Sequence, residues 1–397
     1  MNKNKGKQML LVLGFMAFLA NGDNYAAATL ISKIAQDLNL ELSTATLSVT
    51  AYMLSFGIFT LLFGPLSDRF GKANVINTAA MGTAIFSILG AFAFNLPSLV
   101  FFRSMNGMFG AGIFPITMAL VGETFDDDNR QKALGTVMGM AFLGGATATA
   151  IGGTIAYLGS WRAVYLLYGI GEALLALMMF KLLERDKPAS KKLSIVGSYK
   201  NAITDFKFMR LVVLLFPIGF SVFGSFTYTG INIQELTGFN TLMVGLILSV
   251  FGVGTVIGGR IAPKVRKKLG NGFLLIAGII GFVSLYSFSI YSDIYIKALG
   301  LFGYGVSFIF MQSTIIATAQ EKLPHMKGTA MSLAAFNMFL GAGVGTSVNA
   351  LIMTNYGTSR VFFIAAYLVL TVGSLAGFFV SEFEAEKNEK LIQEIVD

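Results

Sequence analysis

The chain has 397 residues, of which 55% are hydrophobic and only 13% charged, and its formal net charge is +8. A charged share of about half the usual value excludes an ordinary soluble protein, which needs more charge to cover its surface. Long continuous apolar runs indicate membrane-spanning helices, because a membrane barrel alternates apolar and polar residues. Cysteine is absent, which excludes a disulfide framework, a thiolate nucleophile and a cysteine metal site.

The apolar segments divide the chain into two halves. A membrane-spanning helix needs about 20 mostly apolar residues, and six such segments fall on each side of a polar stretch. In the first half they cover about 8–30, 44–66, 73–94, 97–121, 133–157 and 162–183. In the second half they cover about 210–232, 241–262, 272–291, 294–318, 328–351 and 360–381. We therefore predict an all-α membrane protein with twelve transmembrane helices in two pseudo-symmetric six-helix bundles, 1–183 and 210–381, with a linker at 184–209 and a tail at 382–397.

Lysine and arginine are distributed unevenly between the segments that join the predicted helices. If the N-terminus is cytoplasmic, 24 of the 29 basic residues lie on the cytoplasmic side, and only Lys33, Arg162 and Arg360 lie outside. The other two, Arg103 and Lys297, fall inside predicted helices. This asymmetry follows the positive-inside rule. It predicts a multi-pass protein of the plasma or inner membrane with both termini in the cytoplasm. Membrane topology thus accounts for the positive charge, and we expect no nucleic-acid partner. The basic linker is expected to contact anionic lipid headgroups.

Three short matches recur in the same order in the two halves. The sequence GMFGAGIF at 107–114 matches GLFGYGVS at 300–307, and GTVM at 135–138 matches GTAM at 328–331. SWRAVY before the sixth helix matches TSRVFF before the twelfth, which pairs Arg162 with Arg360. Three ordered matches predict an internal duplication. Parallel repeats are a transporter architecture, with the substrate site between the halves near the membrane midplane.

The turn between the second and third helices reads GPLSDRFGK. An acid between two bases in so short a turn suggests a specific partner, and a solvated turn is the alternative. The turn resembles the signature loop of the major facilitator superfamily at Gly64, Asp68, Arg69, Gly71 and Lys72. The resemblance covers essentially the whole chain. It implies a cytoplasmic loop that gates the transport pathway.

The fourth helix carries a further resemblance, in LVFFRSMNGMFGAG. Arg103 and Gly107 match the Arg-x-x-x-Gly motif of the drug:proton antiporters in that superfamily, with Asn106 where glutamine is more usual. The family's arrangement places the first and fourth helices side by side, and the first helix holds Asp23. We expect Asp23 and Arg103 to form a switchable proton-coupling pair, since intramembrane charges mark functional sites. The alternatives are a constitutive structural ion pair, or Arg103 reaching the outer interface.

Glu172 lies near the middle of the sixth helix. A coupling role and a structural hydrogen bond both remain open for it. At the end of the fifth helix, Gly152 and Gly153 fit the antiporter motif, whereas Ala148 and Thr149 replace its Gly-Pro. These glycines, like Gly107, also suit close helix packing.

Polar residues inside apolar helices are the candidates for a substrate cavity, although interhelical hydrogen bonds explain them equally well. They are Asn24, Tyr25, Asn106, Tyr228, Asn232, Gln312 and Asn337.

The sequence thus predicts a secondary transporter that works by alternating access, most similar to twelve-span drug:proton antiporters and the related sugar-efflux branch. We expect export of a small amphipathic drug or metabolite in exchange for protons, by a monomer. The alternatives are a sugar or metabolite carrier with other coupling, and a membrane-embedded enzyme. An enzyme is disfavoured because the sequence has no metal-ligand spacing and no phosphate loop. We expect no metal and no cofactor.

Overall fold

The computed structural model describes residues 3–125, 127–183, 195–323 and 327–396, which are almost entirely helical. The first half contains α1 (Lys3–Asp37), α2 (Leu42–Ala45), α3 (Leu47–Phe70), α4 (Lys72–Ala91), α5 (Leu96–Gly110), α6 (Phe114–Thr124), α7 (Asp127–Leu158) and α8 (Trp161–Leu182). The remainder contains α9 (Ile195–Thr204), α10 (Phe206–Val213), α11 (Leu215–Thr237), α12 (Thr241–Leu269), the 3-10 turn η1 (Gly270–Gly272), α13 (Phe273–Ile290), α14 (Ile294–Lys322), α15 (Lys327–Tyr356) and α16 (Thr358–Val396).

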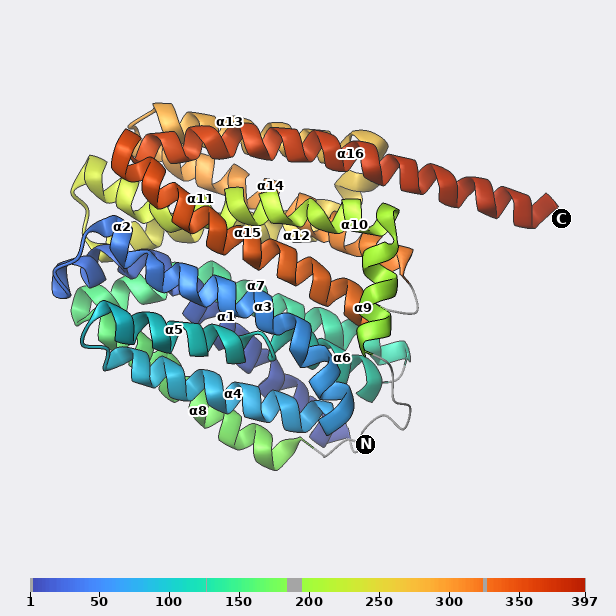
Figure 1. Cartoon of the computed structure of the whole chain (residues 1–397), viewed down its shortest axis with the longest axis horizontal. Coiled ribbons are helices and arrows are strands. Elements are labelled where there is room, and N and C mark those ends of the chain that lie inside the picture. The colour runs from blue at the N-terminus through green and yellow to red at the C-terminus, as the bar shows by residue number, and fades with distance from the viewer. Residues whose placement is uncertain (1–2, 126, 184–194, 324–326, 397) are drawn as a thin grey trace.

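Twelve helical stretches in the described residues are long and apolar enough to cross a membrane. This confirms the predicted all-α fold. Figure 1 shows them as two bundles lying side by side, one with α1 and α3–α8 and the other with α11–α16. Backbone hydrogen bonds are satisfied within each helix, which is what a membrane-spanning segment requires.

The packing of helices repeats between the bundles. In the first, α1 packs on α7, α3 on α5 and α4 on α8; in the second, α11 packs on α15, α12 on α14 and α13 on α16. Each pair in one bundle corresponds by position to a pair in the other. The three short sequence matches therefore reflect a duplication of the whole six-helix unit.

Two helix pairs make the most extensive contacts between the bundles, α7 with α12 and α3 with α15. Small residues allow the first of these approaches. A Cβ atom on Gly153 would lie against the carbonyl of Thr241, and one on Gly245 against the carbonyl of Thr149. Across the second pair, the hydroxyls of Thr50 and Ser347 lie 3.3 Å apart. The seam between the bundles is thus closely packed where a transporter has to slide or rock.

The fourth predicted helix differs from the expectation. It was predicted as one helix over 97–121, but the chain breaks into α5 and α6 around a turn at 111–113. Pro115 lies in the first turn of α6, where its missing N–H costs nothing. Glycine on both sides of Ala111 weakens the helix before it. The corresponding α14 has no proline there and runs without interruption.

Helix α1 begins and α16 ends at the same end of the molecule (Figure 1). We call this end the termini face and the opposite end the far face. The stretch predicted as a linker contains α9, which lies across the termini face. The Tyr199 hydroxyl on α9 donates a hydrogen bond to the Leu61 carbonyl of α3 at 2.9 Å. At the same face, Arg210 and Arg266 form ion pairs with Glu382 and Glu384 of α16.

Candidate functional site

A buried ion pair lies inside the first bundle. Nη1 of Arg103 on α5 lies 3.3 Å from Oδ2 of Asp23 on α1, and both side chains are 1% exposed. Arg103 therefore points into the bundle rather than toward the interface. The sequence placed these two residues at similar depth, and the structure brings them into contact.

Neutral groups on α5 itself and on one further helix, α4, surround the pair. Arg103 Nη1 also donates to Asn106 Oδ1 at 3.1 Å, and the Asn106 amide donates to the Thr83 carbonyl of α4 at 3.1 Å. The Ser87 hydroxyl lies 3.4 Å from Asp23 Oδ2. Asn106 thus connects Arg103 to the backbone of α4. The three-residue spacing between Arg103 and Asn106 puts both side chains on the same helix face, so the sequence alone indicates this contact.

Two tyrosine rings flank the guanidinium of Arg103. Its Cζ lies 4.5 Å from the ring centroid of Tyr52 on α3 and 5.1 Å from that of Tyr165 on α8. Cation–π contacts of this kind stabilise a desolvated arginine. Sequence reasoning missed both tyrosines, because the contacts depend on how α3 and α8 are rotated about their axes.

Hydrogen bonding around the pair is incomplete. Oδ1 of Asp23, together with Nε and Nη2 of Arg103, has no hydrogen-bond partner in the described part of the chain. Buried polar groups are normally satisfied, and the exceptions gather at functional sites. The pair is therefore held by one carboxylate oxygen and one guanidinium nitrogen, and the remaining polar atoms are open to a proton, a water molecule or a ligand.

Glu172 lies on α8 and is fully buried. Neither of its carboxyl oxygens has a hydrogen-bond partner among the described residues. Electrostatic interactions connect it with both Asp23 and Arg103. Tyr168, one turn earlier on α8, packs its ring against Gly22 of α1, next to Asp23. The first bundle thus contains two buried carboxyl groups and one buried guanidinium.

Gly107 determines how close α5 comes to α3. A Cβ atom there would meet the backbone carbonyl of Tyr52. Because Tyr52 flanks Arg103, this close approach also positions the ring on the guanidinium. Gly152 has a similar place on α7, with Ala26 and Thr29 of α1 at 3.0 and 3.3 Å from an added Cβ.

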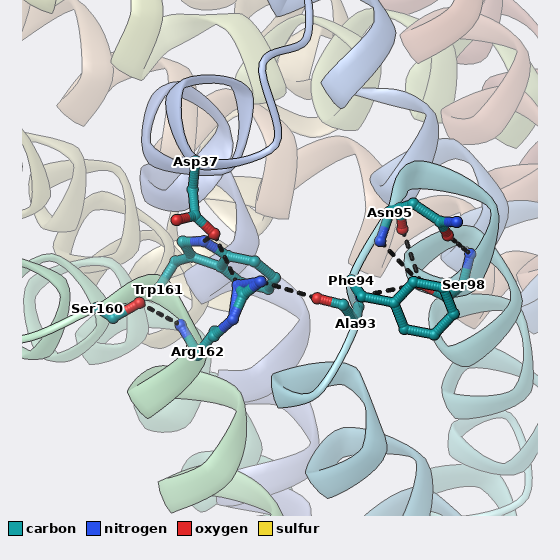
Figure 2. Close-up of polar contacts among 8 residues, drawn as sticks. All are labelled: Asp37, Ala93, Phe94, Asn95, Ser98, Ser160, Trp161 and Arg162. Atoms are coloured by element: carbon teal, nitrogen blue, oxygen red, sulfur yellow. Dashed lines mark hydrogen bonds and ion pairs between the residues drawn. The ribbon is translucent and has the colours of Figure 1, made fainter.

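The start of α5 is fixed by a capping box, which Figure 2 shows. Asn95 Oδ1 accepts from the Ser98 amide at 2.9 Å, and the Ser98 hydroxyl accepts from the Asn95 amide at 3.2 Å. Such a box satisfies two backbone groups that a helix end leaves free. It anchors the helix that carries Arg103.

Figure 2 also shows a second ion pair, at the end of α1, which lies on the far face. Arg162 at the start of α8 contacts Asp37 Oδ2 at 2.8 Å and donates to the Ala93 carbonyl at 2.8 Å. The Trp161 indole N–H donates to the same Asp37 oxygen at 3.1 Å. This cluster links the end of α1, the turn after α4 and the start of α8.

The predicted gating loop lies on the termini face. Arg69 is exposed at the end of α3. Gly71 has φ of 87°, a backbone conformation that glycine adopts without steric cost. Lys72 begins α4 and lies 3.0 Å from Glu123 at the end of α6. Gly64 lies on α3, with the Ser332 hydroxyl of α15 in the other bundle at 3.7 Å from an added Cβ. The side chain of Asp68 lies outside the part that the structure describes.

The predicted cavity residues divide into two groups. Tyr228 donates to the Thr346 carbonyl at 2.5 Å, and the Asn337 amide donates to the Leu333 carbonyl at 2.9 Å. Tyr228 thus links α11 to α15, whereas Asn337 bonds to its own helix, α15. Gln312 contacts the sulfur of Met338 at 3.1 Å.

Tyr25 of α1 lies at the seam between the bundles, and Asn24 precedes it in the same helix. Tyr25 meets Phe223 and Phe226 of α11 edge to face, with ring centroids 5.8 and 6.1 Å apart. Asn24 is buried, and its Oδ1 has no partner among the described residues. Tyr25 thus contacts the other bundle, as does Tyr228, whose hydroxyl lies 3.3 Å from Thr46 Oγ1 before α3.

A buried lysine has a comparable place in the second bundle. Lys297 on α14 is 1% exposed, and its Nζ donates to Asn232 Oδ1 at 2.8 Å and to the Phe288 carbonyl at 2.7 Å. Its Nζ also lies 4.1 Å from the Phe288 ring centroid. Lys297 thus points into the bundle, and Asn232 serves it as a hydrogen-bond acceptor.

A sequence model described as the Major Facilitator Superfamily matches residues 13–346. The chain belongs to the major facilitator superfamily. Its relatives include the multi-drug resistance efflux pump PmrA of Streptococcus pneumoniae, which is 27% identical over 82% of this chain and 83% of that protein. The puromycin resistance protein of Streptomyces alboniger is 24% identical over 83% and 80%. An uncharacterized MFS-type transporter of Bacillus subtilis, YdgK, is 24% identical over 96% and 98%.

Solved transporters of the superfamily share the fold. A bacterial homologue of the human lysosomal transporter Spinster, in an inward-facing and unoccupied conformation, aligns with a TM-score of 0.79 at 12% identity, over 97% of this chain and 99% of that one. The nucleoside transporter NupG aligns with a TM-score of 0.76 at 13% identity, over 94% and 99%. This chain is therefore a multi-pass membrane transporter of the same architecture.

Proposed function

We propose that this transporter exports a small amphipathic drug or metabolite in exchange for protons, by alternating access between the two bundles. Two relatives whose names describe drug efflux or resistance support the export direction. The observation that carries the coupling is the Asp23–Arg103 pair, buried within the first bundle. A chain that contains both bundles holds a complete pathway, so we propose that it works as a monomer.

The geometry of the pair suggests how a proton acts. Arg103 contacts Asp23 through Oδ2, whereas Oδ1 has no partner among the described residues. A proton can bind Oδ1 without displacing the guanidinium. The proton cancels the negative charge of Asp23, which attracts Arg103. Arg103 keeps its contacts with Asn106 and the Tyr52 ring. Protonation thus loosens α1 from α5 while Arg103 stays solvated by neutral groups.

Glu172 extends this scheme. Its electrostatic interaction with Asp23 means that a charge on either carboxyl group disfavours a charge on the other. The arginine compensates one negative charge, and a second buried negative charge has no cation in contact. We propose that Glu172 takes part in holding the transported proton.

The substrate cavity is proposed to lie between the bundles, near Asn24 and Tyr25. Both residues adjoin Asp23 in sequence, so movement of α1 on protonation would reach the substrate directly. We further propose that the termini face is cytoplasmic, from the distribution of lysine and arginine. The Gly64–Lys72 loop then gates the cytoplasmic side, and the Lys72–Glu123 contact ties it to α6.

The test uses purified protein in proteoliposomes that contain a trapped pH indicator. A pH gradient is imposed, a panel of cationic dyes and sugars is added, and the proton flux that each compound triggers is measured. Wild type is expected to show such flux, and Asp23→Asn is expected to lose it. Asp37→Asn is the matched control, because Asp37 is also an α1 aspartate paired with an arginine but lies on the far face.

Two outcomes would overturn the proposal. Substrate movement in wild type without proton flux would mean a uniporter or another coupling ion. Full proton-coupled transport by Asp23→Asn would reduce the Asp23–Arg103 contact to a structural ion pair.

A further inference from the structure

The two bundles end differently on the far face. In the first bundle, the acid at the end of α1, Asp37, is neutralised by Arg162 at 2.8 Å. In the second bundle, Glu235 lies in the last turn of α11, and the counterpart of Arg162 is Arg360. Arg360 lies instead near the Phe363 ring, at 5.6 Å from its centroid. Both an acid and an arginine are thus present in each bundle, but among the described residues only the first bundle pairs them.

Glu235 is linked to neutral groups. Its Oε2 accepts a hydrogen bond from the Thr358 hydroxyl at 2.9 Å, and Thr358 Oγ1 accepts from the Asn232 amide at 2.8 Å. Asn232 in turn accepts from Lys297. In each of these three hydrogen bonds the donor lies on the Lys297 side and the acceptor on the Glu235 side. This hydrogen-bond chain joins α14, α11 and α16, and aligned hydrogen bonds of this kind polarise one another.

Glu235 also lines a cavity of about 330 Å³ on the far face. The cavity lies at the seam between the bundles, because its walls come from α1 and the turn after it on one side and from α11 on the other. Its polar walls include Gln36 and Gln234, and Leu40 and Leu42 form an apolar wall. A volume of this size is at the lower end of the range for small-molecule sites.

The charge of the cavity is negative. Glu235 is the charged residue in its lining, and Glu41 lies between the two lining leucines. Arg162, at the start of α8 on the same face, is paired with Asp37. A single carboxylate beside an apolar wall and two amides suits a ligand with one positive charge and an apolar body.

We propose that this far-face cavity binds lipophilic organic cations, with Glu235 as the counter-charge. A bound cation competes with Thr358 for the Glu235 carboxylate. The hydrogen-bond chain then carries that competition to Lys297, so occupancy at the seam is felt inside the second bundle. Naming such cations as exported substrates rests on the proposed function, whereas the binding itself does not.

The experiment uses the absence of cysteine from the chain. Ser32 lines the cavity, and Ser32→Cys places a single thiol there. Purified Ser32→Cys protein in detergent is labelled with a maleimide at increasing concentrations of benzyltriethylammonium. Tyr295→Cys, at a site on α14 that is 82% exposed, controls for a general effect on labelling. No gradient is present, so the measurement is independent of transport and of coupling.

Protection of the Ser32→Cys thiol, but not of the Tyr295→Cys thiol, is the expected result. Adding Glu235→Gln should raise the cation concentration for half protection by roughly fivefold, the effect of removing one charge about 4 Å away in water. Glu41→Gln removes an equal charge beside the lining and should have a smaller effect. Size-exclusion profiles establish that each variant is folded.

Absence of protection at Ser32→Cys would overturn the proposal, as would equal effects of Glu235→Gln and Glu41→Gln, which would indicate only a diffuse surface potential. Neither result would affect the proton-flux test of Asp23. Conversely, loss of the antiport function would leave this binding site standing.

Discussion

Replacing Asp23 with asparagine should destabilise the protein strongly, because it removes the counter-charge of a buried arginine. Both side chains of the pair are 1% exposed. Breaking such a buried pair from one side costs about 3–5 kcal/mol, since it leaves an uncompensated charge in a low-dielectric interior. Arg103 retains Asn106 and two tyrosine rings, so we expect the lower part of that range.

Removing both charges should recover much of the loss. The double variant Asp23→Asn/Arg103→Met carries neither charge of the pair, and replacing a buried ion pair by uncharged groups is often close to neutral. The double-mutant cycle should therefore give an interaction free energy of about 3 kcal/mol or more in magnitude, because Asp23→Asn alone loses about that much and the double variant loses little. A purely additive cycle would refute the reasoning, because it would mean that the two charges do not stabilise each other.

The assay can follow a single fluorophore. The chain contains one tryptophan, and Trp161 is buried at the far-face end of the first bundle. Its fluorescence reports the unfolding of the bundle that holds the pair. Unfolding is measured in mixed detergent micelles for the wild type, both single variants and the double variant under the same conditions, because membrane-protein unfolding depends on the micelle.

Further predictions concern packing and the termini face. Gly107→Ala should destabilise the protein by about 1–3 kcal/mol through overpacking against the Tyr52 backbone, whereas Gly122→Ala, with nothing within 4 Å of its added Cβ, should be tolerated; equal unfolding midpoints would contradict this. Lys72→Met should cost less than about 1 kcal/mol, because Glu123 is 63% exposed. That difference should shrink in high salt, and a loss that salt does not change would show that the pair acts as a buried contact.

The helical content and the number of spans could be read from the sequence, because both follow from local rules. An uninterrupted apolar segment of membrane length has no alternative to a helix in lipid. The break between α5 and α6 was missed, although its signals, Gly110, Gly112 and Pro115, are present in the sequence. These signals do not predict a break by themselves, because membrane-spanning helices often contain glycine and proline without being interrupted.

The charged residues show the limit more clearly. The cost of an intramembrane charge marked Asp23, Arg103 and Glu172 as special. That cost does not predict which group each charged side chain contacts. Asp23 contacts Arg103, whereas Glu172 has no hydrogen-bond partner among the described residues. The difference arises from the rotation of α8 against α1, which no residue pattern in a uniformly apolar helix specifies.

The sequence by itself determined the membrane class, the twelve helices, the duplication and the identity of the charged candidates, because each depends on composition, length or spacing along the chain. Only the tertiary structure decided which of those charges are paired, that Tyr52 and Tyr165 flank Arg103, and that Glu235 faces a cavity while Asp37 is neutralised. Such contacts join residues from helices far apart in the chain. They depend on helix rotation and on close approaches at residues such as Gly107 and Gly153, which are set by the packing of all the helices together.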